Sequence, residues 1–175
     1  MSYNILYIED ENADSIKTDI ESNGINVSVL QPSGFETDLA NIQKLGYDAY
    51  LMDFRLTSGR GKVDAATIAT TLQTDRNNQR KAPIIKRSTK KNLPHFENDF
   101  TSQDLFDVVI GKDAFRREHK KYTNRIKALI DAYRVTQQNE FNISNILQID
   151  NIDLLDYRFL SILDKFASRK DVYGY

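Results

Sequence analysis

Short apolar runs alternate with stretches of helical periodicity along most of the chain. The runs predict buried strands at residues 5–8, 27–29, 50–52, 83–88 and 106–110. The periodic stretches predict helices at residues 13–22, 36–44 and 65–72, and a short or distorted helix at 90–103. Strands that alternate with helices in this way are the signature of a doubly wound parallel sheet. We therefore expect an α/β fold with a five-stranded parallel sheet.

The C-terminal third has a different pattern. Apolar residues keep a helical period over residues 114–136, and again over 152–167, with a polar linker at 142–145 between them. We expect residues 1–136 to form one domain and residues 137–175 to form a helical C-terminal extension. The apolar stripe of the first helix is longer than a compact domain of this size needs, so another surface should cover it.

Two arrangements would cover that stripe. The two helices could pack on each other as a hairpin, or they could pair across a two-fold axis in a homodimer. We favour the homodimer, in which the self-complementary face is built from Tyr122, Ile126, Leu129 and Tyr133.

Several residues that can carry chemistry stand where predicted strands end. Glu9 and Asp10 follow the first strand and Asp53 follows the third. Ser88 ends the fourth strand and Lys112 follows the fifth. Because parallel strands end at one edge of the sheet, these side chains can converge. Clustered carboxylates repel one another unless a cation joins them, and such hard oxygen ligands suit Mg²⁺. A lysine and a hydroxyl beside that metal could bind phosphoryl oxygens.

This arrangement resembles the receiver domain of two-component response regulators over residues 4 to about 136. Glu9 and Asp10 match the acidic pair of that family, and Asp53 matches its phosphoacceptor. The remaining matches are the loop glycine eight residues after Asp53, the serine or threonine that ends the fourth strand, and the family lysine, here Gly61, Ser88 and Lys112. The resemblance implies a flavodoxin-like fold of the receiver type.

The resemblance also implies a function. Asp53 would accept a phosphoryl group from a sensor histidine kinase or a phosphotransfer protein, and the C-terminal helices would relay this signal to an output. Catalysis would be confined to phosphoryl transfer onto Asp53 and its later removal. Ser88 and Lys112 would bind the phosphoryl oxygens. Mg²⁺ would be held by Asp10, Asp53, the carbonyl of Arg55 and, partly through water, Glu9.

Two departures from the family pattern leave an alternative open. Asp113 follows Lys112 where the family usually has proline, so we expect a trans peptide bond and a differently shaped loop there. Val109 stands where the family often has an aromatic switch residue. The alternative is a receiver-like protein–protein interaction module that works without phosphorylation.

Composition and charge narrow the function further. The 175 residues carry a formal net charge of −1, which argues against nucleic acid as a partner. A DNA-binding role for residues 140–175 is weaker still, since they lack helix-turn-helix spacing and would repel phosphates through Asp150, Asp153, Asp156 and Asp164. The chain has no cysteine, no recognisable signal peptide and no run of membrane-spanning length. We therefore expect a cytoplasmic protein with no membrane partner.

Overall fold

The computed structural model describes residues 2–32, 42, 46–53, 56, 65–74, 82–88 and 106–148. The helices expected at 90–103 and 152–167 lie outside these ranges, and so does the helix expected at 36–44, except for Ile42. Arg55 and Gly61 also lie outside the described residues.

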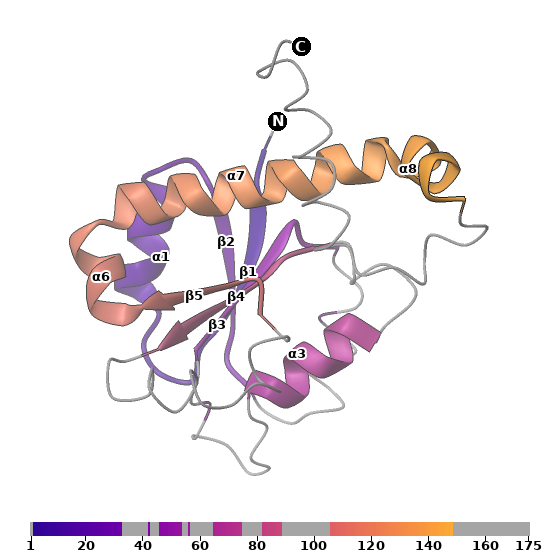
Figure 1. Cartoon of the computed structure of the whole chain (residues 1–175). Helices are drawn as coiled ribbons and strands as arrows, with labels where there is room; N and C mark the ends of the chain where they lie inside the picture. The colour runs from indigo at the N-terminus through magenta and orange to yellow at the C-terminus, as the bar shows by residue number, and fades with distance from the viewer. Residues whose placement is uncertain are drawn as a thin grey trace.

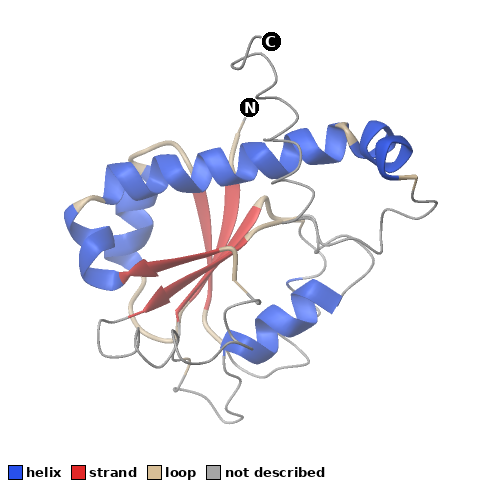
Figure 2. Ribbon diagram, in the orientation of Figure 1, coloured by secondary structure: helices blue, strands red, loops and turns tan. Residues whose placement is uncertain are grey.

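Five parallel strands form one sheet in the order β2-β1-β3-β4-β5. The strands are β1 (Asn4–Ile8), β2 (Asn26–Leu30), β3 (Ala49–Asp53), β4 (Ile84–Ser88) and β5 (Val108–Gly111). All residues of the central strand β3 are buried, as expected for a strand that is covered on both faces. The doubly wound five-stranded sheet predicted from the sequence is thus confirmed, and Figure 2 shows it between its helices.

Helices cover both faces of the sheet. The described helices are α1 (Asp14–Glu21), α3 (Ala65–Thr74), α6 (Lys112–Arg117), α7 (His119–Gln138) and α8 (Glu140–Leu147). Figure 1 shows α1 and α7 on one side of the sheet and α3 on the other. On the first side, Ile16 and Ile20 of α1 share a core with Ile126 and Ile130 of α7, whereas Ile68 and other residues of α3 belong to a second core. Burial of these apolar faces stabilises the layers.

The C-terminal helices differ from the prediction in two ways. The single helix expected at 114–136 is interrupted at Glu118, whose φ of −129° and ψ of 39° are not helical, so α6 and α7 are separate. The polar linker expected at 142–145 is wrong, because these residues belong to α8. Within α8, Ile143 is buried while Asn142 and Asn145 are exposed, so the polar residues form the solvent face of a helix.

The face that we assigned to a homodimer is buried inside its own domain, which corrects that assignment. Ile126 is only 1% exposed and Tyr133 only 3% exposed, and Tyr122 and Leu129 pack against the same core. The Tyr133 hydroxyl donates a hydrogen bond to the carboxylate of Asp107. The apolar stripe is long because α7 packs against both the sheet and α1. A second copy of the chain is therefore not needed to bury it.

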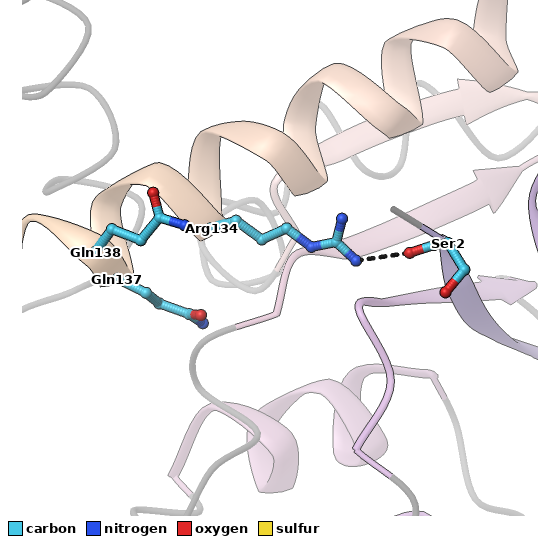
Figure 3. A pocket seen from close by; sticks show the side chains of 4 residues that line it. All are labelled: Ser2, Arg134, Gln137 and Gln138. Atoms are coloured by element: carbon cyan, nitrogen blue, oxygen red, sulfur yellow. Dashed lines mark hydrogen bonds between the residues drawn. The ribbon is translucent and has the colours of Figure 1, made fainter.

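The N-terminal segment adds to the area that α7 covers. The guanidinium of Arg134 donates hydrogen bonds to the carbonyl of Ser2 at 2.9 Å and to the carboxylate of Asp48 at 2.7 Å. The hydroxyl of Tyr3 donates to Asp131 at 2.9 Å. Figure 3 shows Arg134 reaching from α7 to Ser2 along a pocket at this end of the helix. Arg134 forms an ion pair with Asp48 and a hydrogen bond with Ser2, so it holds the segment that leads into β1 against α7.

Candidate functional site

Three carboxylates meet at the carboxyl edge of the sheet. Glu9 directly follows β1, Asp10 comes next, and Asp53 is the last residue of β3. Each offers a carboxylate oxygen within 4.8 Å of the others. β1 and β3 are neighbours in register, with Ile8 opposite Met52, so residues just beyond this pair must lie close together. Glu9 and Asp53 are 3% and 4% exposed, so two of the three charges are nearly removed from water.

A lysine that follows the edge strand β5 reaches the same cluster. Lys112 is the first residue of α6, immediately after β5, and its Nζ lies 2.7 Å from Oδ2 of Asp53. Its side chain is 18% exposed and that of Asp53 is 5% exposed. The Lys112–Asp113 peptide bond is trans, as predicted, because no cis bond occurs in the described part of the chain. Asp113 is the second residue of α6, and its acidic side chain lies in the first turn of this helix.

Ser88 also lies at this edge of the sheet. It is fully buried at the end of β4, one residue beyond Arg87, which stands opposite Asp53 in the register of the sheet. The structure thus brings Glu9, Asp10, Asp53 and Lys112 together and places Ser88 on the adjacent strand end. The remaining predicted metal ligand, the carbonyl of Arg55, lies outside the described residues.

The donor set fits a small, hard cation. Oδ1 of Asp53 is buried and has no hydrogen-bond partner within the described part of the chain. Burial raises the pKa of Glu9, and the nearby charge of Asp53 raises it further, against the lowering effect of the hydrogen bond from Tyr7. A cation bound between these carboxylates would satisfy the free oxygen and favour the charged form of Glu9. Carboxylate oxygens that leave room for water are the ligands that Mg²⁺ prefers.

Sequence reasoning missed a second cation next to the cluster. Arg87 is only 1% exposed, and its Nη1 lies 3.7 Å from Oε2 of Glu9. The hydroxyl of Tyr7 links the two groups, since it accepts a hydrogen bond from Arg87 and donates one to Glu9. The guanidinium also lies over the rings of Tyr7 and Phe115. The signal in the sequence was a pair of basic residues inside β4, which an entirely apolar buried strand would not contain.

The similarity of this chain to known proteins lies in its three-dimensional structure and not in its sequence. Neither a protein-family model nor a curated protein matches the sequence. A sensor protein from Polaromonas sp. JS666 superposes with a TM-score of 0.61 and 20% identity, over 75% of this chain and 98% of that one. A receiver domain from Methanospirillum hungatei superposes with a TM-score of 0.59 and 21% identity, over 77% and 98%.

One of these structures also contains a metal. It is the receiver domain of a sensor histidine kinase from Pseudomonas aeruginosa, with a magnesium ion coordinated in its active-site cleft. It superposes with a TM-score of 0.58 and 22% identity, over 75% of this chain and 99% of that one. The chain therefore has the flavodoxin-like fold of response-regulator receiver domains, and Glu9, Asp10 and Asp53 form an acidic cluster that could hold a metal ion. In the part that the structure describes, no helix is long and apolar enough to cross a membrane.

Proposed function

We propose that the chain is a signalling receiver that accepts a phosphoryl group on Asp53, with Mg²⁺, from a sensor histidine kinase or a phosphotransfer protein. The observation that carries this proposal is the contact between Lys112 and Asp53 inside a cluster of three carboxylates. A lone aspartate at a strand end is unremarkable. An aspartate that meets two further carboxylates and a lysine at one sheet edge has the parts that phosphoryl transfer requires.

In this reaction an oxygen of the Asp53 carboxylate forms a bond to phosphorus as the bond between phosphorus and the donor's imidazole nitrogen breaks. The electron pair of that bond stays on the imidazole, which takes up a proton. Lys112, which is paired with Asp53 in the structure, is then placed to bind an oxygen of the new phosphoryl group. Ser88, buried at the neighbouring strand end, would donate its hydroxyl to a second oxygen.

Glu9, Asp10, Asp53 and the carbonyl of Arg55 would hold Mg²⁺. When bound, the ion neutralises charge on the carboxylates and on the phosphoryl oxygens. The side chains of this protein do the rest: they orient the nucleophile and keep part of the site away from water, since Glu9 and Asp53 are almost fully buried.

The signal would leave the site through the helix that begins at Lys112. α6 starts at this residue and contacts α7, which in turn contacts α8. When Lys112 exchanges the carboxylate of Asp53 for a phosphoryl oxygen, its movement would be passed to α6 and from there to the extension beyond residue 136. A cytoplasmic location agrees with this role. A homodimer through the C-terminal helices remains a prediction, and its contact surface has to use exposed side chains such as Phe141 and Ile146 of α8.

The proposal is tested by incubating the protein with acetyl phosphate and Mg²⁺ and measuring its intact mass. We expect one phosphoryl group on the wild type and none on Asp53→Asn, which keeps the shape of the side chain but is not a nucleophile. Glu11→Gln is the matched control, because Glu11 is exposed, lies next to the cluster and does not belong to it. Equal labelling of wild type and Asp53→Asn would show that another residue is the acceptor.

A second candidate function is favoured by a specific observation. Lys112 is paired with Asp53 and Arg87 with Glu9, so two cations already offset the carboxylates without a metal. A cluster neutralised in this way could serve a receiver-like module that binds a partner protein without being phosphorylated. If neither wild type nor Asp53→Asn takes up phosphate from acetyl phosphate while both fold, this second function is the better account.

A further inference from the structure

Arg87 stands on the same face of the sheet as the nucleophile and its acidic neighbours. It is the register partner of Asp53 on the adjacent strand, and cross-strand partners project to the same face. Tyr7 and Glu9 lie on this face as well, because they alternate with Ile8 along β1. The ion pair with Glu9 is buried on both sides, since the two side chains are 2% and 4% exposed. Arg87 is therefore part of the environment of the site.

The positive charge of Arg87 changes the net charge of the site. Glu9, Asp10 and Asp53 carry three negative charges, and Lys112 and Arg87 offset two of them. One net negative charge remains to attract a dication, whereas two would remain without Arg87. A phosphoryl group on Asp53 replaces one negative charge by nearly two, which restores the attraction.

We propose that Arg87 is a positioning residue that, by holding Glu9 through Tyr7, lowers the Mg²⁺ affinity of the unphosphorylated site and couples metal binding to phosphorylation. This inference rests on the proposed function of the same site. Arg87 would compete with the metal for the charge of Glu9, because its Nη1 lies 3.7 Å from Oε2 of that carboxylate. A unit charge about 7 Å from a dication, in a water-like dielectric, changes its affinity by about tenfold.

Arg87→Gln removes the charge and keeps an amide that can donate to the Tyr7 hydroxyl. We expect it to bind Mg²⁺ about tenfold more tightly than the wild type in isothermal titration of the unphosphorylated protein. Arg87→Lys is the matched control, because it keeps the charge and should stay within about twofold of the wild type. A purely structural arginine would give a different result: both variants would lose thermal stability and keep the wild-type affinity. That outcome would overturn the proposal.

A measurement on the wild type keeps the proposal testable if Arg87→Gln does not fold. The guanidinium resonances of Arg87 are followed by nuclear magnetic resonance while Mg²⁺ is added. Competition for Glu9 requires these resonances to shift in proportion to Mg²⁺ saturation. Resonances that stay in place at saturation would overturn the inference.

The inference and the proposed function fail in different ways. If acetyl phosphate labels Asp53 in the wild type but Arg87→Gln has the wild-type affinity for Mg²⁺, only the inference is wrong. If Arg87→Gln binds Mg²⁺ about tenfold more tightly but no phosphoryl group is ever found on Asp53, Arg87 does lower the Mg²⁺ affinity, whereas the coupling to phosphorylation and the proposed function are wrong.

Discussion

Replacing Asp10 by asparagine should stabilise the protein without Mg²⁺ and remove most of the stabilisation that Mg²⁺ provides. Asparagine has the shape of aspartate and can still hydrogen bond, so the main change is the loss of one charge. That charge lies within 4.8 Å of carboxylate oxygens of Glu9 and Asp53. Asp10 is also a direct ligand in the proposed metal site. The same substitution should therefore have opposite effects on stability with and without the metal.

The size of both effects follows from the geometry. Two unit charges 4.8 Å apart, the largest separation within the cluster, repel by roughly 0.9 kcal/mol in a water-like dielectric, and by more when they are closer or the dielectric is lower. Asp10 faces two carboxylates, but Lys112 and Arg87 offset part of their charge, so we expect a net gain of about 1 kcal/mol in the free energy of unfolding. That is a rise of about 2–4 °C in melting temperature for a chain of this length. The wild type should gain about 1.4 kcal/mol when Mg²⁺ reaches ten times its dissociation constant.

Thermal unfolding followed by circular dichroism, with EDTA and with excess Mg²⁺, measures both effects. Asp10→Asn should melt above the wild type in EDTA, and it should gain much less than the wild type when Mg²⁺ is added. Glu11→Gln controls for the loss of an acidic charge nearby and should follow the wild type in both conditions. The reasoning is refuted if Asp10→Asn melts below the wild type in EDTA, or if Mg²⁺ stabilises the two proteins equally.

Three further predictions concern α7 and α8. Ile126→Ala should lower the free energy of unfolding by about 2–4 kcal/mol in urea titration, whereas Ile146→Ala, at a side chain 77% exposed, should change it by about 0.5 kcal/mol or less. An equal effect of both would mean that α7 does not cover the sheet. Arg134→Ala should speed amide hydrogen exchange at the start of β1, and unchanged exchange there would contradict its fastening role. A homodimer that uses the exposed side chains of α8 should be seen by light scattering and should dissociate on Phe141→Ser, and a monomeric wild type would exclude it.

The sequence was sufficient for the sheet and for most of the site, for a clear physical reason. Buried parallel strands need continuous apolar runs, and such runs are short and easily recognised, as in Tyr50–Met52. The carboxyl ends of these strands share an edge, so the convergence of Glu9 and Asp53 followed from topology without any knowledge of side-chain contacts.

The features that the sequence could not predict depend on contacts between segments that are distant along the chain. Burying the charge of Arg87 would be costly without partners, and Glu9 and Tyr7 supply these partners from β1 and the residue after it. No local sequence pattern reveals such contacts. The apolar stripe of α7 gave the right helix and the wrong partner, since periodicity shows that a face is covered and not what covers it. The interruption at Glu118 has no proline or glycine to mark it, so the periodicity of the sequence runs through it.

The account rests on Asp53 as a nucleophile, and the most direct test is to find the phosphoryl group on that residue. Borohydride reduces an acyl phosphate of aspartate to homoserine, which peptide mass spectrometry can locate. After incubation with acetyl phosphate and borohydride, we predict homoserine at position 53 when Mg²⁺ is present and unmodified aspartate when EDTA replaces it. Homoserine at Asp14 or any other aspartate, the longer alcohol that reduction of a glutamyl phosphate would leave at Glu11, or an unmodified Asp53 in Mg²⁺ would contradict the account.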